Sequence, residues 1–563
     1  MTAIDWTQIF IFAALFILLT PLLGRYIYLV MNGQRTWLHP LLQGLENFSY
    51  RLSGIDAQKE MPWTTYGKNL LVFNLIGFLV LFLILKLQSF LPFNPQNFPA
   101  VSWSLAFNTA VSFTTNTNWQ AYTGETTLSY FSQMLGLTVQ NFLSAASGLA
   151  ALLVLLRGFT RKTSSTVGNF WVDLVRSVVY IFLPLSFIFA LFLMSQGVVQ
   201  TLSPYVEVQT LEQAKQIIPL GPVASQVAIK QLGTNGGGFF NANGAHPFEN
   251  PSGLTNLLET LAILLIPAAL LYTYGLWIGS KRHAWILFFV MLLLWGGGVA
   301  LSLYSEFTWD TSLFCGPLLE GKESRFGITQ SALWSVSTTA TSNGSVNAML
   351  DSLTPLAGGV SLFNIMLGEL IFGGVGVGLC SMLMFTLLTV FLAGLMVGRT
   401  PEYLGKKIEK REMQWVVLAV IMPGALILIG AGISCVLPVA LTSLTNAGPH
   451  GLSEILYAFA SSSGNNGSAF AGLNADTLYY NLFLGVVMIL SRVAILLPSL
   501  AIGGLMAAKK TSPLSEGTFS TNSFLFAMLL FSVIMIVGAL TFFPALSLGP
   551  LVEHLLMLNG QSF

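Results

Sequence analysis

The stretch Gly233-Thr234-Asn235-Gly236 interrupts an apolar chain, and three similar polar clusters accompany it: Thr115-Asn116-Thr117-Asn118, Thr341-Ser342-Asn343-Gly344 and Gly464-Asn465-Asn466-Gly467. We number them polar loops 1 to 4 in chain order. They recur at intervals of roughly 110 to 120 residues, and such spacing of similar segments is the signature of an internal repeat. A short segment, long enough to enter a membrane only halfway, precedes each one: 104–114, 223–232, 328–340 and 452–462.

The composition is that of an integral membrane protein. Apolar residues make up 54% of the 563 positions and charged residues 8%, whereas a soluble chain carries roughly 25% charged residues. The formal net charge of +1 offers no basic excess for nucleic acid. Ten apolar runs are long enough to cross a bilayer: 6–30, 69–92, 129–156, 172–196, 257–279, 284–304, 361–395, 414–437, 479–507 and 524–547.

The predicted fold class is therefore all-α and polytopic, with four helix, pore loop, helix repeats around a pore. One extra spanning helix lies at each end of the chain. The predicted units are an N-terminal helix at 1–30, pore repeats at 67–156, 172–279, 284–395 and 414–507, and a C-terminal helix at 524–547.

Orientation follows from the basic residues. Most of the 24 lysines and arginines fall in alternate loops that exclude the polar loops, and basic loops stay in the cytoplasm. Ten spans place both termini on one side. We expect that side, together with the polar loops, to face outward.

The polar loops have the residue types of a potassium filter. Irregular backbone at membrane depth is tolerated where it is buried or lines a watery cavity, and a potassium filter replaces the hydration shell with backbone carbonyl oxygens. Gly, and Asn better than most residues, tolerate the backbone angles required. The clusters lack acidic side chains, which argues against a calcium site. Ordinary surface turns use the same residue types, but four matching places in a repeat favour a filter.

Other features leave alternatives open. The run 361–395 carries Glu369 and a series of glycines that includes Gly373 and Gly374, so it either breaks beneath the third loop and gates the path, or packs closely through small residues. Arg492 lies within an apolar run and should face the bundle interior, as a structural partner or in the ion route. The basic stretch 399–407 is a topology anchor or a docking site.

Catalytic and cofactor motifs are missing from the sequence. It has no phosphate-binding Gly-x-x-x-x-Gly-Lys-Ser/Thr segment and no Asp-Lys-Thr-Gly segment, so we expect no ATP hydrolysis by this chain itself. The histidines and the three cysteines, Cys315, Cys380 and Cys435, lack metal-ligand spacing. We expect potassium as the transported ion and no organic cofactor.

Several long motifs resemble one known family. They are Asn116-Thr117-Asn118-Trp119-Gln120, the stretch 233–243 (GTNGGGFFNAN), 246–251 (HPFENP), 321–327 (GKESRFG) and 398–407 (GRTPEYLGKK). These motifs, and the chain from first span to last, are similar to the KdpA family, the potassium-translocating subunit of a bacterial potassium ATPase.

The resemblance implies a filter, partners and a location. It assigns filter duty to Asn116, Thr117, Asn118, Thr234, Asn235, Gly236, Ser342, Asn343, Gly344, Asn465, Asn466 and Gly467, with Gln120 nearby. Some members have Cys where this chain has Asn343, and we expect a backbone carbonyl to serve there. Glu369, Gly373, Gly374 and Arg399 look like the family's gating region, and Arg492 like a residue of its conducting path. The implied partners are a KdpB-like P-type ATPase subunit and KdpC-like and KdpF-like subunits in the bacterial inner membrane, with both termini periplasmic.

Three hypotheses follow. The first is a transport subunit of a primary pump that depends on a separate ATPase, which the quoted motifs and the two extra spans favour. The second is a self-sufficient channel or ion-coupled transporter of the same fold. The third is a membrane enzyme, for which His246 and Glu249 are too few and are better explained by loop capping or structural hydrogen bonds.

Overall fold

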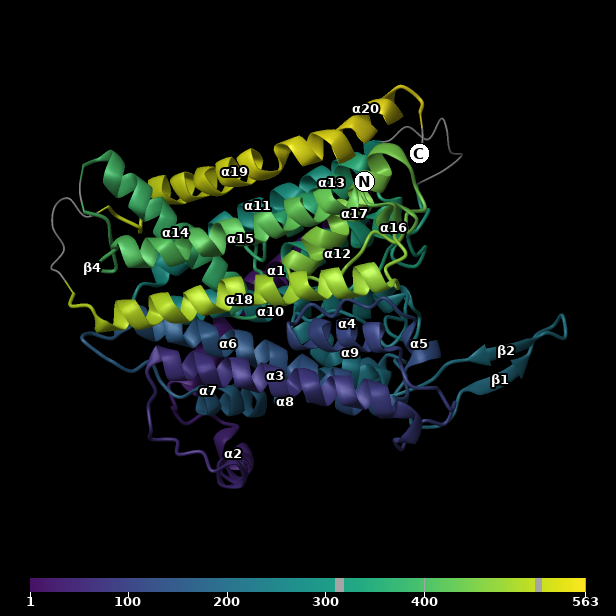
Figure 1. The fold of residues 1–563 in the computed structure, drawn as a ribbon, viewed down its shortest axis with the longest axis horizontal. Coiled ribbons are helices and arrows are strands. Elements are labelled where there is room, and N and C mark those ends of the chain that lie inside the picture. Colours follow the sequence, from purple (N-terminus) through teal and green to yellow (C-terminus); the bar gives the residue numbers. More distant parts are fainter. Residues whose placement is uncertain (309–317, 399, 512–518, 562–563) are drawn as a thin grey trace.

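The chain is a bundle of long helices that run along one direction (Figure 1). The computed structural model describes residues 1–308, 318–398, 400–511 and 519–561. Cys315 and Arg399 lie outside the described residues.

Ten helices among the described residues are long and apolar enough to cross a membrane, as the hydropathy predicts. A helix satisfies all its backbone hydrogen bonds internally, which is why lipid-exposed segments of this composition take that form. They are α1 (Ala3–Met31), α3 (Trp63–Leu87) with η1 (Gln88–Phe90), η2 (Ser132–Thr138) with α6 (Val139–Thr160), α7 (Phe170–Arg176) with η3 (Ser177–Phe182) and α8 (Leu183–Ser195), α10 (Gly253–Trp277), α11 (Lys281–Thr308), α14 (Val377–Met396), α15 (Lys410–Ser434), α18 (Leu478–Ala508), and α19 (Phe524–Leu546) with η6 (Ser547–Leu551) and α20 (Val552–Leu558).

Four shorter helices occupy the predicted half-membrane segments: α4 (Trp103–Thr114), α9 (Val223–Leu232), α12 (Gly327–Ala340) and α17 (Gly448–Ser463). All four are largely buried among the long helices. We refer to them as the pore helices. The remaining short helices are α2 (His39–Ser53), α5 (Gly124–Thr127), η4 (Asn243–Ala245), η5 (Leu350–Ser352), α13 (Pro355–Met366) and α16 (Pro438–Leu441).

The strands lie at opposite ends of the bundle. The hairpin β1 (Val206–Gln209) and β2 (Lys215–Ile218) is antiparallel and projects beyond the helices at the end where both termini lie (Figure 1). The two-residue strands β3 (Glu402–Tyr403) and β4 (Lys406–Lys407) pair at the other end, between α14 and α15. We call these the hairpin end and the basic end.

The predicted run 361–395 is not one helix. Helix α13 ends at Met366 and α14 begins at Val377, so residues 367–376 form a break. Gly368 and Gly376 have φ of 70° and 81°, a left-handed conformation that glycine adopts readily. Of the two alternatives, the structure therefore has the broken helix. Small residues also pack closely at the break, because a Cβ at Gly378 would lie closer than 3.0 Å to Gly373 Cα.

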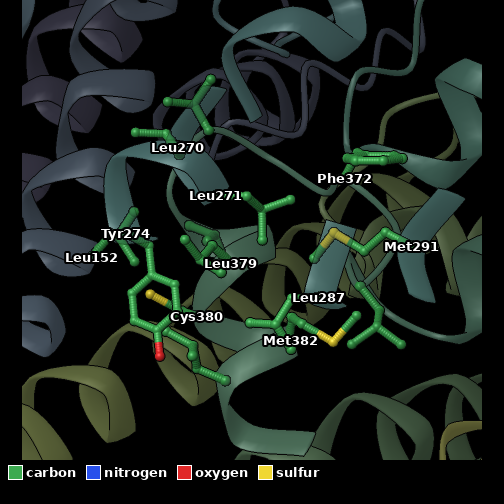
Figure 2. Close-up of a cluster of buried hydrophobic side chains, with 14 of the residues drawn as sticks. Leu152, Leu270, Leu271, Tyr274, Leu287, Met291, Phe372, Leu379, Cys380 and Met382 are labelled. Carbon is green, nitrogen blue, oxygen red and sulfur yellow. The ribbon is translucent and has the colours of Figure 1, made fainter. Parts of the chain in front are cut away.

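The largest apolar core joins the middle of the bundle. Leu270 and Leu271 of α10, Met291 of α11 and Leu379 and Met382 of α14 are all buried in it, and Figure 2 shows these side chains converging. The core therefore holds the break, between α13 and α14, against helices of the second and third repeats.

Candidate functional site

Each polar loop begins where a pore helix ends. Asn116 and Asn118 in polar loop 1 have φ of 66° and 53°, and Asn465 and Gly467 in polar loop 4 have φ of 44° and 94°. Gly and Asn are the residues that enter this left-handed region most readily. The composition of the loops thus lets the backbone turn sharply at the buried C-terminal ends of the helices.

The four loops touch one another in a closed ring. Between loops 1 and 2, Asn118 Nδ2 donates to Gly236 O at 3.0 Å. The other contacts are so close that a Cβ on one glycine would lie under 3.0 Å from a carbonyl oxygen of the next loop: Gly236 against Asn343, Gly344 against Asn466, and Gly467 against Thr117. The order around the ring is therefore 1, 2, 3, 4 and back to 1.

Asparagine amides brace the ring from one element to the next. The donated hydrogen bonds are Asn116 Nδ2 to Thr234 O (2.8 Å), Asn235 Nδ2 to Asn116 Oδ1 (2.6 Å), Asn343 Nδ2 to Lys230 O (3.1 Å), Asn465 Nδ2 to Thr117 Oγ1 (2.9 Å) and Asn466 Nδ2 to Thr341 O (2.8 Å). Asn343 Oδ1 also accepts from Ser345 N at 2.9 Å. Buried amides that are bonded in this way rigidify a site, so the ring is held by its side chains.

A cavity of about 360 Å³ opens over the ring on the hairpin end. All four loops contribute to it or border it, through Asn118, Gly237, Gly344 and Gly467. Gln120 lines the same cavity and bonds to both backbone groups of Gly238, with Nε2 donating to the carbonyl at 3.0 Å and Oε1 accepting from N–H at 2.8 Å. Gln120 therefore sits at the mouth of the ring and links loop 1 to the segment after loop 2.

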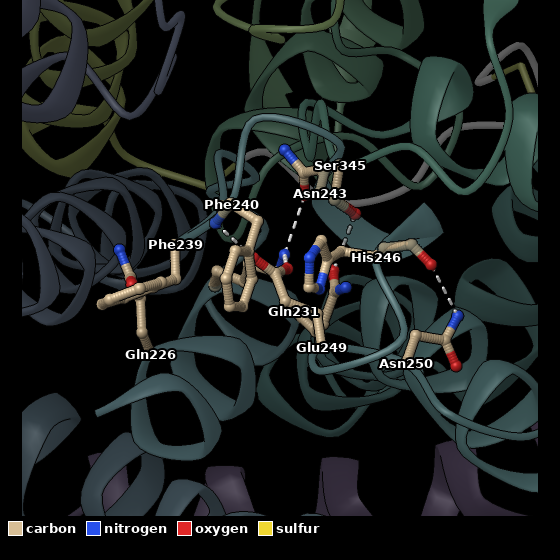
Figure 3. Close-up of polar contacts among 12 residues, drawn as sticks. Gln226, Gln231, Phe239, Phe240, Asn243, His246, Glu249, Asn250 and Ser345 are labelled. Atoms are coloured by element: carbon tan, nitrogen blue, oxygen red, sulfur yellow. Dashed lines mark hydrogen bonds and ion pairs between the residues drawn. The ribbon is translucent and has the colours of Figure 1, made fainter. Parts of the chain in front are cut away.

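A buried ion pair supports polar loop 2 from behind. Lys230 and Glu249 are fully buried and paired, and Lys230 Nζ also donates to Asn243 Oδ1 at 2.8 Å. Glu249 Oε1 accepts from Phe240 N at 2.9 Å, as Figure 3 shows. Glu249 thus makes the structural hydrogen bonds expected of it. Lys230 was not predicted, although a lysine in an apolar pore segment is an expensive residue that marks a partner.

The break lies directly beneath loops 2 and 3. Ser342 Oγ donates to Glu369 Oε2 at 3.1 Å, and Val375 N donates to Thr234 Oγ1 at 2.9 Å. Thr234 has φ of 48°, a genuine outlier for a β-branched residue, and such residues cluster at functional sites. Gly374 is so close to Ser342 Oγ that a Cβ would lie under 3.0 Å from it.

Arg492 reaches the same place from α18. Its Nη1 lies 3.8 Å from Glu369 Oε1, and its Nη2 donates to Ser144 O at 3.4 Å. Glu369 and Arg492 are 3% and 5% exposed. Glu369 Oε1 and Arg492 Nη1 have no hydrogen-bond partner among the described residues, so the two charges face each other across a loose gap. The structure brings Glu369, Gly373, Gly374 and Arg492 together beneath the ring, while Arg399 falls outside the described part.

Comparison with known proteins identifies the family of this chain. The family model described as "KdpA: Potassium-transporting ATPase A subunit" matches residues 10–555. The chain belongs to the KdpA family. A protein of Leptospira interrogans named "Potassium-transporting ATPase potassium-binding subunit" is 55% identical over 561 residues, which cover 99% of this chain and all of that protein. Proteins with the same name from Pseudomonas putida and Methylorubrum extorquens are each 54% identical, over 99% and 100% of this chain and 99% of each of those proteins.

Solved structures similar to this KdpA chain include one of a potassium transporter. The potassium transporter TrkH from Vibrio parahaemolyticus aligns with a TM-score of 0.47 and 15% identity, over 74% of this chain and 82% of that one.

Within this KdpA chain, the twelve residues predicted for the filter all lie in or immediately beside the contacts that close the ring. Their roles toward an ion stay predictions. What sequence reasoning missed is the support: Lys230, Asn141 and Ser144, whose side chains bond to the loops or to their partners. Asn141 and Ser144 lie on an apolar spanning helix, and their polarity there is the sequence signal that could have identified them.

Proposed function

We propose that the ring of polar loops is a potassium filter, in which backbone carbonyl oxygens replace the hydration shell of the ion. The single observation that carries this proposal is the closed order of contacts between four loops of similar sequence. The loops contain no acidic side chain, and the C-terminal ends of four pore helices, which carry partial negative charge, meet there. The residues assigned to this duty are the twelve named above, with Gln120 at the mouth.

The chain would act as the potassium-binding subunit of an ATP-driven uptake system. Its relatives carry that name, and the family description is that of an ATPase A subunit. We infer that ATP is hydrolysed by a KdpB-like P-type ATPase subunit, that KdpC-like and KdpF-like subunits complete the assembly, and that it resides in the bacterial inner membrane with the hairpin end outside. Basic loops at the opposite end favour this orientation.

The route below the filter would pass the break. Glu369 and Arg492 face each other there, beside glycines that carry no side chain to hinder a shift of the backbone. We assign residues 367–376 a gating role, with Gly373 and Gly374 as closely packed positions where a side chain would disturb the break and the Glu369–Arg492 pair as the charged groups that an ion meets after the ring.

The test is uptake of radioactive rubidium in a potassium-uptake-deficient bacterium. The chain is expressed alone, with its ATPase partners, and with partners whose ATPase subunit is catalytically inactive. We expect uptake with active partners only. Uptake by the chain alone would instead identify a channel or an ion-coupled transporter, and a lack of uptake with correctly assembled, active partners would contradict the potassium assignment.

A further inference from the structure

Four ionisable side chains meet at the hairpin end, away from the ring. His450 and Glu454 stand one turn apart at the start of the pore helix α17, and residues four apart lie on the same helix face. Asp351 comes from η5, which follows polar loop 3, and Glu553 comes from α20 at the end of the chain. None of them takes part in the filter, the break or the buried pair behind loop 2.

Both nitrogens of His450 face carboxylates. Nε2 lies 2.8 Å from Asp351 Oδ1, and Nδ1 lies 2.8 Å from Glu553 Oε1. One ligand atom from each of Asp351, His450 and Glu454 can be chosen so that all three lie within 4.8 Å of one another. Three donors from two separate segments are thus gathered at the spacing of ligands around one ion.

Glu454 provides an independent observation that favours a cation here. The residue is 1% exposed. Its Oε1 accepts from Asn446 Nδ2 at 2.8 Å, but Oε2 is buried and has no hydrogen-bond partner among the described residues. A buried carboxylate oxygen without a partner is costly, and a metal ion bound by its neighbours would satisfy it.

We propose that Asp351, His450 and Glu454 bind a divalent transition-metal ion, and that Zn²⁺ fits this donor set best. Imidazole is a ligand for zinc-like metals, whereas Ca²⁺ takes six to eight oxygen ligands. Histidine nitrogen and carboxylate oxygen are both ligands of Zn²⁺, and zinc sites with three protein donors leave a fourth position for water. In this arrangement His450 binds through Nε2, on the side of Asp351, and its Nδ1–H donates to Glu553.

Glu553 is then a positioning residue. Ligand histidines regularly donate their second ring N–H to a carboxylate, which fixes the ring's orientation and tautomer. Because Glu553 belongs to α20, the ion would join three places: the segment after polar loop 3, the pore helix that leads to polar loop 4, and the last helix of the chain. The site is separate from the proposed filter and does not depend on it.

The experiment uses the full-length chain, purified in detergent, treated with a chelator and then titrated with Zn²⁺. Bound zinc is measured by equilibrium dialysis with elemental analysis. We expect one Zn²⁺ per wild-type chain, a loss of at least about 100-fold in affinity for His450→Gln and Glu454→Gln, and a loss of about 10- to 100-fold for Glu553→Gln. The matched control is Glu212→Gln, an exposed residue of the hairpin tip, which should bind as the wild type does.

A second readout needs no variant and therefore survives any folding defect. The X-ray absorption spectrum of the zinc-loaded wild-type chain should show only nitrogen and oxygen neighbours, with imidazole scattering. Sulfur neighbours would assign the zinc to cysteine and overturn the proposal. Absence of stoichiometric zinc binding, unchanged zinc binding in the folded His450→Gln and Glu454→Gln chains, or tighter binding of Ca²⁺ than of Zn²⁺ would overturn it as well.

Discussion

At the scale of single residues, close packing limits which side chains the ring can accommodate. Gly236 has φ of 71°, and a Cβ there would lie under 3.0 Å from the backbone of Asn343. The obstacle is main chain of the neighbouring loop, which is itself tied to Lys230 O by the Asn343 amide, so the contact cannot be relieved by rotating a side chain. Substitution therefore has to move the carbonyls that we assign to the ion.

We predict that Gly236→Ala raises the rubidium concentration for half-maximal uptake by the complete complex at least about tenfold, or about 1.4 kcal/mol. Gly236→Asp should raise it further, because a charge also enters the ring. The control is Gly44→Ala, since a Cβ on that helical glycine meets nothing within 4 Å. An unchanged half-saturation in both Gly236 variants would contradict the filter assignment.

The buried Lys230–Glu249 pair yields a prediction on stability. Removing one partner leaves the other charge buried and uncompensated, which destabilises a protein by about 3–5 kcal/mol. We expect Lys230→Met to lower the free energy of unfolding by that amount, measured by denaturant titration in detergent. The double variant Lys230→Met, Glu249→Gln should recover part of the loss.

The matched control lies on the hairpin. Lys215 and Glu207 are 3.7 Å apart, with side chains 85% and 67% exposed, and exposed pairs contribute about 0–1 kcal/mol. Lys215→Met should therefore change the free energy of unfolding by less than about 1 kcal/mol. Equal effects of Lys230→Met and Lys215→Met would refute the supporting role of the buried pair.

At the scale of elements, the break separates α13 from α14, which lie within one continuous apolar run of the sequence. The glycines weaken the helix, and the contacts of the break with Thr234 and Ser342 hold it under loops 2 and 3. A change inside the break should act on passage of the ion more than on its capture at the mouth.

Gly374→Ala tests this separation. The added Cβ would lie 2.6 Å from Glu369 Oε2 and closer still to Ser342 Oγ, so it forces apart the two groups of a 3.1 Å hydrogen bond. Loss of about 1.4 kcal/mol corresponds to a tenfold fall in rate, and we expect a fall of that order in maximal uptake. Half-saturation should change less than in Gly236→Ala.

Gly296→Ala serves as the control for this substitution. The residue lies within α11, and a Cβ there meets nothing within 4 Å. Uptake by this variant should match that of the wild type. If Gly374→Ala raised half-saturation as much as Gly236→Ala and left the maximal rate intact, the break would belong to the filter and not to a gate.

The loop before α3 is fastened to the loop after α6 by Glu60. A hydrogen bond from Arg161 lowers the pKa of Glu60 from 4.5 to about 2, and the two side chains are 2.6 Å apart. Because the folded pKa is the lower one, the stabilisation is present above pH 4.5 and is lost as the pH falls toward 2. Glu60 is 43% exposed, so solvent screening limits the contribution to about 1 kcal/mol or less.

We therefore expect Glu60→Gln to have a lower Tm than the wild type at pH 6, and the difference to shrink when both are measured near pH 3. Arg161→Gln should behave in the same way, and the double variant should lose little more than either single one. A Tm difference that is independent of pH would exclude the ion pair as its cause.

At the scale of the whole molecule, hydropathy predicted those features of the fold that depend on local composition. Ten spans and four pore helices follow from apolar runs and their lengths, and the polar loops from Gly and Asn within them. The run 361–395 could not be resolved, since its sequence allows both a continuous helix and a break, and only the contacts at Thr234 and Ser342 distinguish them. The bracing by Ser144 and Lys230 depends on which segments meet in the fold, and the sequence indicates only that such polar residues need partners, not which partners they have.

Both ends of the chain contact pore helices at the hairpin end. Asp5 accepts a hydrogen bond from Thr329 at the start of the pore helix α12, at 2.7 Å, and Glu553 faces His450 at the start of α17. The first and last helices thus begin and end at the hairpin end, while most basic loops lie at the other. By the positive-inside rule the hairpin end should face outward.

Single cysteines test this in intact cells, in a chain whose Cys315, Cys380 and Cys435 are replaced by Ser. We expect a membrane-impermeant maleimide to label Leu211→Cys, at the fully exposed hairpin tip, and to label Trp37→Cys, which is 74% exposed between α1 and α2, only after permeabilisation. In inside-out vesicles the pattern should reverse. Labelling of Trp37→Cys alone in intact cells would show that the ring faces the cytoplasm. A filter for uptake could not then be the first part of the protein that the ion meets.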